Sequence, residues 1–323
     1  MRSRQVLLSP LIKEKICQHL TFEEIVNLRN ALELPSLKCL IPINDKNRQI
    51  LFLKGINDSS ILAYREIQIH GSIQALIKAA SEDNFEITKA LLDHGASANS
   101  GNFNRNTPLC SAASQDNYKV VKLLLERKAE VDHLGQCEAS ALMWAAHHGH
   151  SKTAKILIKN KADVNIINQL GNTALIWAAR GNHLKVVKLL LKNKVIDNGT
   201  SALAEACQNG NYKVVKTLLA NQADVNDTDR QGNTILMRAS NLGPLKIVTK
   251  LVKYGANLNA KNIWGNTALM LMSLRGHFEI VKFLLERKAD INAVNQFNAS
   301  ALTWARENRK PDMVKLLLEN GAV

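Results

Sequence analysis

Two sequence markers recur along the chain in one register, and their period limits the fold more than any other feature. The first marker is the residue that follows two mostly aliphatic residues in stretches of the type Val-Val-Lys-x-Leu-Leu. It falls at Lys89, Lys122, Lys155, Lys188, Lys216, Thr249, Lys282 and Lys315. The second is a residue with leucine two positions later, at Gln74, Thr107, Ser140, Thr173, Ser201, Thr234, Thr267 and Ser300. Both markers advance by 33 residues, apart from one step of 28 between Lys188 and Lys216. Such a period predicts an array of stacked units.

Each unit has the pattern of two short helices and a loop. The Thr or Ser marker is placed to cap a first helix, because its hydroxyl can accept a hydrogen bond from an unpaired backbone N–H. Alanines such as Ala178 and Ala179 follow, and they let neighbouring helices approach closely. After a turn such as Gly149-His150, the apolar spacing of residues 184–191 predicts a second helix whose lysines face solvent. Residues 162–165, Ala-Asp-Val-Asn, and their variants end the unit before a polar loop.

These units resemble the ankyrin repeat, in the Thr107-Pro108-Leu109 start, the Gly149-His150 turn and the Ala-Asp-Val-Asn end. The resemblance covers roughly residues 70 to 323. It implies an all-α ankyrin-repeat solenoid of helix pairs stacked into a curved array, with hairpin loops, called fingers, on one side. The predicted units are 70–102, 103–135, 136–168, 169–196 (shortened), 197–229, 230–262, 263–295 and 296–323, the last as a capping unit.

The array departs from the ankyrin pattern at the end of the second helix. The family has glycine there, and this chain keeps it at Gly95, Gly255 and Gly321. The replacements elsewhere are Lys128, Lys161, Lys194, Gln222 and Lys288. We expect these residues to adopt the left-handed conformation at a cost of about 1 kcal/mol each.

Residues 1–69 lie outside the repeat frame and predict a small helical domain. Thr21 with Glu24 forms a capping box, which indicates the start of a second helix. The segment is similar to an F-box, a helical module that docks on the Skp adaptor of a cullin–RING ubiquitin ligase. On that resemblance the docking residues are Leu11, Ile12, Ile16, Leu20, Ile25 and Leu28. The alternative is that the same residues form an N-terminal helical cap on the first unit.

Composition narrows the classes of partner. The formal net charge of +14 is compatible with binding to nucleic acid, with binding to an acidic protein surface, or with a lysine-rich face that only contacts solvent. Because most lysines lie on the predicted second helices, away from the groove that the resemblance implies, we favour the solvated face over nucleic-acid binding. No apolar run approaches the ~20 residues that a membrane span needs, so we expect no membrane partner.

The sequence contains no recognisable catalytic motif. Phosphate-binding loops, dinucleotide-binding glycines, nucleophile elbows and zinc-protease motifs are all absent, so we expect a protein that is not an enzyme and has no cofactor or metal. The five cysteines are dispersed, which indicates a reducing compartment. We therefore expect a monomer in the cytoplasm, or in the host cytosol if the protein is a secreted effector.

Surface positions that vary between units are the candidates for partner binding. They are Trp144, His147, His148, Leu170, Trp177, Arg180, Asn241, Trp264, Arg275 and Phe297. The two helical tryptophans have packing between units as their alternative role, and the two histidines have metal binding as theirs. Leu170, Trp264 and Phe297 stand near finger tips, where an apolar group with no core to join is a candidate anchor. The shortened finger near Lys194–Gly199 is either a neutral deletion or a notch that admits a partner.

Together these observations predict a scaffold that binds a partner protein through the concave face and the fingers. The alternative is an F-box-type substrate receptor, in which the array selects a target and residues 1–69 recruit the ligase. Nucleic-acid binding through the basic surface is a third and less favoured hypothesis.

The F-box hypothesis predicts that the purified chain binds a recombinant Skp adaptor. Replacing Leu20 and Ile25 with aspartate should abolish that binding, because charge at an apolar interface is costly. A pull-down measures the binding, and circular dichroism checks that both proteins are folded. A folded wild-type chain that does not bind the adaptor would leave residues 1–69 as a cap.

Overall fold

The computed structural model describes residues 73–323, except residues 94, 194, 196–201 and 241–243. The described residues all belong to one compact unit, Ser59–Val323. The predicted domain 1–69, with its F-box-like residues, lies outside the described residues. So do Asn241 and nearly all of the shortened finger.

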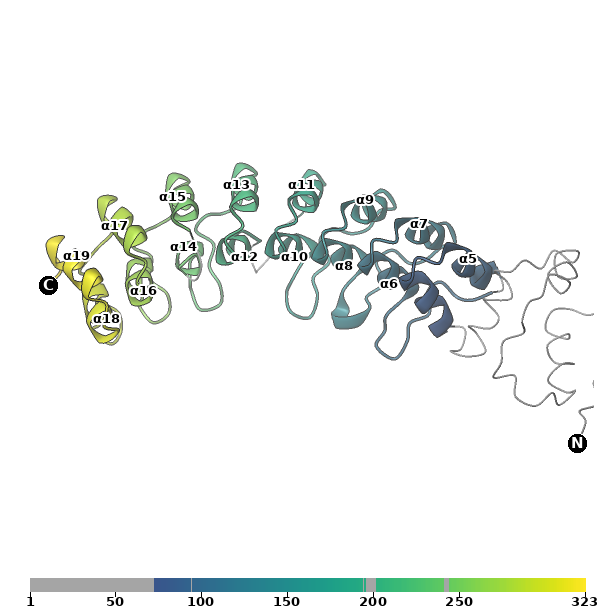
Figure 1. The fold of residues 1–323 in the computed structure, drawn as a ribbon, viewed down its shortest axis with the longest axis horizontal. Coiled ribbons are helices and arrows are strands. Elements are labelled where there is room, and N and C mark those ends of the chain that lie inside the picture. Colours follow the sequence, from purple (N-terminus) through teal and green to yellow (C-terminus); the bar gives the residue numbers. More distant parts are fainter. Residues whose placement is uncertain (1–72, 94, 194, 196–201, 241–243) are drawn as a thin grey trace, which may run out of the picture. The chain divides into compact units, whose positions relative to one another are not determined.

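Short first helices and longer second helices alternate along the described residues (Figure 1). Residues 73–81 are helical. The later first helices are α6 Pro108–Ser114, α8 Ala141–His147, α10 Ala174–Arg180, α12 Ala202–Gln208, α14 Ile235–Arg238, α16 Ala268–Arg275 and α18 Ala301–Glu307. The second helices, each of nine residues, are α5 Phe85–Asp93, α7 Tyr118–Glu126, α9 Ser151–Lys159, α11 Leu184–Lys192, α13 Tyr212–Ala220, α15 Leu245–Lys253, α17 Phe278–Glu286 and α19 Pro311–Glu319.

Little other regular structure occurs in the described residues. A short 3-10 segment, η1, spans Gln136–Glu138, and a single antiparallel bridge joins Thr228 to Thr234. No β-strand is present in the described ranges. The predicted all-α fold is confirmed.

The Thr or Ser marker caps the first helices, as the sequence predicts. Its backbone is extended, and its hydroxyl accepts a hydrogen bond from the backbone N–H three residues later. In α6 the Thr107 hydroxyl accepts from Cys110 at 3.2 Å, and equivalent bonds cap α8, α10, α14, α16 and α18. Such a cap is worth about 1 kcal/mol. Gln74 differs, because it lies within the helical stretch 73–81 rather than ahead of it.

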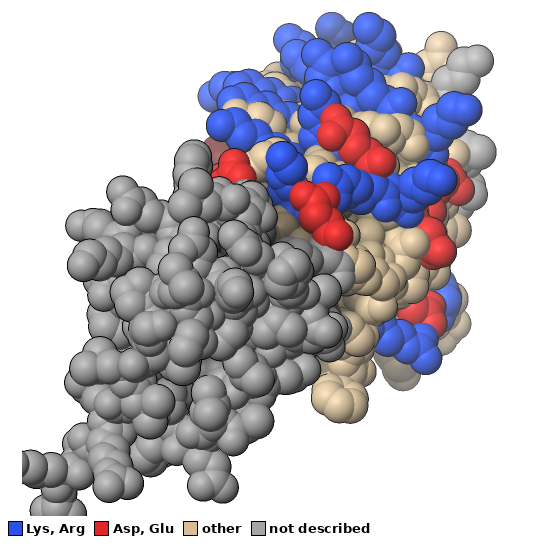
Figure 2. Space-filling view, turned by 90° about the vertical axis from the view of Figure 1, so that its right-hand side faces the viewer, with Lys and Arg blue, Asp and Glu red and all other residues tan. Residues whose placement is uncertain are grey.

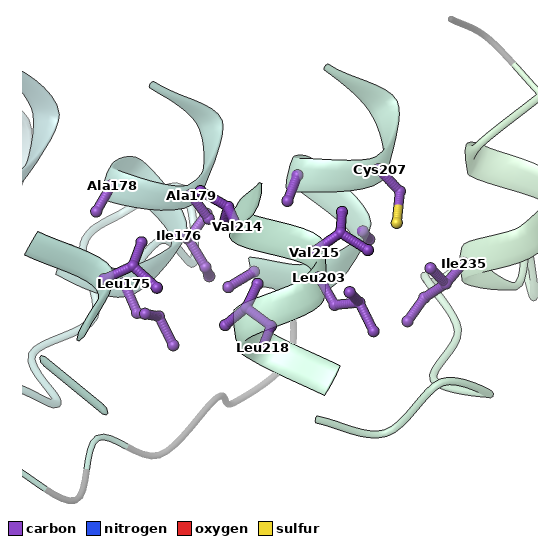
Figure 3. Close-up of a cluster of buried hydrophobic side chains, with 14 of the residues drawn as sticks. Leu175, Ile176, Ala178, Ala179, Leu203, Cys207, Val214, Val215, Leu218 and Ile235 are labelled. Carbon is purple, nitrogen blue, oxygen red and sulfur yellow. The ribbon is translucent and has the colours of Figure 1, made fainter. Parts of the chain in front are cut away.

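Apolar side chains from successive units fill the space between them (Figure 3). Leu175 and Ile176 of α10, Leu203 of α12, and Val215 and Leu218 of α13 are almost completely buried. Each first helix from α6 to α18 contacts the next first helix, and each second helix contacts the next second helix. Burying a leucine or isoleucine side chain is worth about 1.5–3 kcal/mol. The units therefore stabilise one another as neighbours.

The second helices end in a left-handed residue whether or not it is glycine. The φ angle is +86° at Gly95 and +89° at Gly255, and it is also positive at the predicted non-glycine positions. These are Lys128 at +63°, Lys161 at +66°, Gln222 at +65° and Lys288 at +64°. The expectation of left-handed residues here is confirmed for the four that are described.

Asparagine side chains close the fingers and link one finger to the next, which the sequence analysis did not anticipate. The Asn262 side-chain oxygen accepts from the backbone N–H groups of Trp264 at 3.1 Å and Asn266 at 2.9 Å. Its amide donates to the Asn233 side chain at 2.8 Å, and the Asn295 amide donates to Asn266 at 2.8 Å. These bonds fix the finger loops relative to each other, so their tips are presented from a rigid base.

The left-handed lysines predict a stabilising substitution. Lys161→Gly should raise the free energy of unfolding by about 0.5–1 kcal/mol, because glycine adopts a positive φ without steric cost. Lys159→Gly is the control, since Lys159 is in the last turn of α9 and glycine there should cost about 0.5–1 kcal/mol. Urea unfolding followed by circular dichroism measures both. Equal destabilisation by both variants would contradict the strain at Lys161.

Candidate functional site

Two tryptophans and two histidines form one aromatic cluster on α8 and α10. The Trp144 and Trp177 ring centroids lie 5.5 Å apart, and the His147 ring lies 5.1 Å from that of Trp177 and 4.7 Å from that of His148. Trp177 is only 7% exposed and Trp144 is half-buried, whereas both histidines are exposed. The tryptophans therefore pack between units, and the histidines form the outer surface of the cluster.

Both histidines of the cluster are biased toward the neutral form. Burial lowers the pKa of His147, and the charges of Arg180 and His183 lower it further. Burial also lowers the pKa of His148, with contributions from His147, His150 and His183. Since the ordinary histidine pKa is about 6.5, both rings are uncharged at neutral pH. They act there as aromatic groups with one hydrogen-bond donor and one acceptor each.

The histidines that follow the helix turns join neighbouring units. The His150 ring Nε2–H donates to the Ser114 carbonyl at 3.0 Å, and the His183 ring Nε2–H donates to the His147 carbonyl at 2.9 Å. His150 is thus the turn residue that the sequence indicated. Across the described part of the chain, no group of three or more His, Cys, Asp or Glu residues is placed to hold a metal ion.

A buried carboxylate next to the aromatic cluster links three first helices. Glu205 of α12 is 7% exposed, and its two oxygens contact Arg180 Nε and Arg238 Nη2, each at 2.9 Å. Arg238 Nη1 also lies 3.4 Å from Asp229. Burial acts to raise the pKa of Asp229, but hydrogen bonds from Asn233 and the neighbouring backbone, together with the Arg238 charge, hold it below its ordinary value. Asp229 is thus charged at neutral pH. The contacts of Glu205 and Asp229 hold the Arg180 and Arg238 guanidinium groups in place.

The sequence analysis selected Arg180 but missed Glu205 and Arg238. Both stand at the helix position that Trp144 and Trp177 occupy in the two preceding units. A lone acidic residue among the alanines of α12, followed one unit later by arginine, was the available indication. The Arg180 side chain is 42% exposed, so it extends the histidine surface with a fixed positive charge.

The finger-tip candidates differ in exposure. Leu170 is 73% and Phe297 76% exposed, whereas Trp264 is 37% exposed and its carbonyl accepts a hydrogen bond from the Gln296 backbone N–H of the next finger. Phe103 is fully exposed and Ile263 is 54% exposed, and the sequence analysis named neither. Both precede the tip position by one residue, which explains why the repeat frame overlooked them.

The described candidate Arg275 does not join the cluster of Trp144, His147, His148 and Trp177, because it lies on α16. Arg275 at the end of α16 is exposed and donates to the Ser240 hydroxyl at 2.8 Å. Asn241 lies outside the described residues. The structure therefore brings together Trp144, His147, His148, Trp177 and Arg180, which we call the aromatic–arginine surface. Trp264 and Phe297 lie on two adjacent fingers several units further along.

Comparison with known proteins gives a consistent result. The family model described as ankyrin repeats (3 copies) matches residues 55–135, 128–198, 192–262 and 236–323. The solved structures that resemble this chain include the crystal structure of the human ASB11 ankyrin repeat domain, with a TM-score of 0.62 and 26% sequence identity. That match covers 67% of this chain and 98% of the ASB11 domain. No curated protein sequence matches.

The buried carboxylate predicts a strong effect of removing its charge. Glu205→Gln should lower the free energy of unfolding by about 2 kcal/mol, because it leaves two partly buried guanidinium groups without their shared anion. Lys188→Gln on the exposed side of α11 is the control and should change it by less than about 0.5 kcal/mol. Urea unfolding compares the two. Similar small effects would mean that the network contributes nothing to stability.

The lowered histidine pKa values predict the sign of a pH effect. An unfolded chain binds protons at these two residues more readily than the folded one, so stability should fall as the pH drops below about 6.5. The melting temperature is measured at pH values of about 7 and about 5 for the wild type and for His147→Gln with His148→Gln. The melting temperature of the variant should fall less on acidification than that of the wild type. An equal loss in both proteins would refute the shifts.

Proposed function

Because the chain belongs to the ankyrin-repeat family, we propose that it binds a partner protein through the aromatic–arginine surface and the finger tips. Ankyrin repeats indicate a protein–protein interaction scaffold, and proteins of this family are typically non-enzymatic interaction domains. Neighbour stacking stabilises such an array from within, and this leaves its surface residues available for recognition.

The observation that carries the proposal is the fixed geometry of the aromatic–arginine surface. Arginine is among the residues that most often dominate interface energies, and Arg180 is exposed on this surface together with His147 and His148. The Trp177 and His147 rings pack in a T-shaped arrangement, and the ion pair with Glu205 holds Arg180 in one orientation. A side chain that is already ordered loses less conformational entropy on binding, which leaves more of the contact energy as affinity.

The finger tips provide a second contact region. Leu170 and Phe297 expose most of their apolar surface on loops that asparagine bonds close. An exposed apolar side chain on a rigid loop gains free energy when a partner covers it. We infer that a partner contacts the tips with apolar groups and the aromatic–arginine surface with polar and aromatic groups.

A binding titration tests the surface directly. Once affinity capture has identified a partner, His147→Ala with Arg180→Ala should weaken its affinity at least about tenfold, as should Leu170→Ala with Phe297→Ala. Leu318→Ala is the matched control, because Leu318 is 47% exposed on the second helix α19, whereas both regions are built on first helices and fingers. Calorimetry gives the dissociation constants. A partner whose affinity is unchanged in both double variants would refute the proposed surface.

The F-box-type receptor is the alternative form of this proposal. It is supported by the helical pattern of residues 1–69, which matches the module at Ile16, Leu20 and Leu28. In that form the array selects the target and the Skp adaptor binds residues 1–69. A cytoplasmic location, in the host cell for a secreted effector, suits either form. In the described residues, no helix is long and apolar enough to cross a membrane.

A further inference from the structure

The second helices divide into two groups by charge. Four consecutive ones, α9, α11, α13 and α15, carry eleven lysines and neither an acidic residue nor an arginine. The flanking helices α5, α7, α17 and α19 carry five lysines and seven acidic residues. We call the eleven lysines the lysine face. They are Lys152, Lys155, Lys159, Lys185, Lys188, Lys192, Lys213, Lys216, Lys246, Lys250 and Lys253.

The lysine face is a two-dimensional array of charge. Lysine stands at the second residue of all four helices, at the fifth residue of three, and at the ninth residue of three. The second and ninth residues of a helix are about 10 Å apart along its axis. Adjacent helices of the four are in contact. All eleven lysines are exposed except the half-buried Lys250, whose ammonium lies 5.5 Å from the centroid of the Tyr254 ring.

Folding alone does not explain this arrangement. Like charges three or four residues apart destabilise a helix, and α9, α11 and α15 each hold three lysines at such spacings. Two of the flanking helices pair a lysine with an acid instead: Lys122 lies 3.7 Å from Glu126 in α7, and Lys315 lies 4.0 Å from Glu319 in α19. No lysine of the lysine face has an ion pair with any described residue. In Figure 2, where the second helices lie uppermost, lysine and arginine side chains dominate the upper edge.

We propose that the lysine face binds the surface of an anionic lipid bilayer. A bilayer presents negative headgroups across a plane, which matches charges spread over four neighbouring helices. Lysine is a hydrated point charge that attracts such headgroups without the paired contacts for which arginine is preferred. Tyr212, Leu245 and Tyr254 border the lysines and are 38%, 36% and 41% exposed. Tyrosine is favoured at a membrane–water interface.

This inference is independent of the proposed partner-protein surface, which is built on first helices and fingers. None of the described helices could cross a membrane, but an ionic contact with lipid headgroups needs no membrane-spanning helix. Together the two surfaces would let the chain hold a partner protein close to a membrane.

The size of the effect follows from the number of charges. Each lysine near an anionic bilayer raises the partition coefficient about fivefold. Neutralising four lysines should therefore lower it by roughly a hundredfold or more, and the binding of the wild type should weaken as salt screens the charges.

The test is co-sedimentation of the full chain with vesicles of phosphatidylcholine and phosphatidylserine in equal parts, with phosphatidylcholine vesicles for comparison. The test variant carries Lys152→Gln, Lys155→Gln, Lys185→Gln and Lys188→Gln. The control variant carries Lys89→Gln, Lys122→Gln, Lys282→Gln and Lys315→Gln. Both lose the same net charge, but the control positions lie on the acid-bearing helices. Circular dichroism checks that both variants are folded.

We expect the wild type to bind only the phosphatidylserine vesicles. The test variant should lose roughly a hundredfold in partition coefficient and the control less than about fivefold. Equal losses in the two variants would overturn the proposal, since only total charge would then matter. It would also be overturned if the wild type ignored the vesicles at low salt, including the case in which it bound duplex DNA in a parallel titration.

Discussion

The burial of apolar surface between neighbouring units is the interaction on which the rest of the structure depends. A pair of short helices cannot enclose Leu175, Ile176 and the alanines that follow them, so each unit completes its core with the side chains of the next. The 33-residue period follows from this packing, because every unit must present the same two faces to its neighbours. Polar links reinforce the same contacts, as in the bonds from His150 and His183 to the preceding unit.

Because the stacking depends on the buried leucines and alanines, the other helix positions differ from unit to unit. The helix position that holds Trp144 and Trp177 holds Glu205 and Arg238 in the next two units, and the first helices still stack on one another even though α14 has only four residues. The aromatic–arginine surface and the lysine face therefore lie on the same scaffold but on different elements. The first is made from first helices, and the second is made from second helices. Each can be altered without disturbing the buried leucines and alanines.

The sequence predicted the parts of the structure that repeat. Helix order, the capping role of Thr107 and its equivalents, and the left-handed conformation of Lys161 all follow from local rules applied in one register. The sequence did not predict the Glu205 network or the asparagine links between fingers, because both join side chains about 30 residues apart. Such contacts depend on the exact stacking of two units. The exposure of Phe103 was also missed, because Phe103 lies one residue before the finger-tip position that Leu170, Trp264 and Phe297 occupy in other units.

Hydrogen–deuterium exchange of the chain, alone and with a captured partner protein, tests the central claim most directly. The account predicts slower exchange on binding in α8, α10 and the finger loops at Leu170 and Phe297, with no change in α9, α11 or α13. Exchange that slowed only in the second helices would contradict the assignment of partner binding to the first helices and fingers.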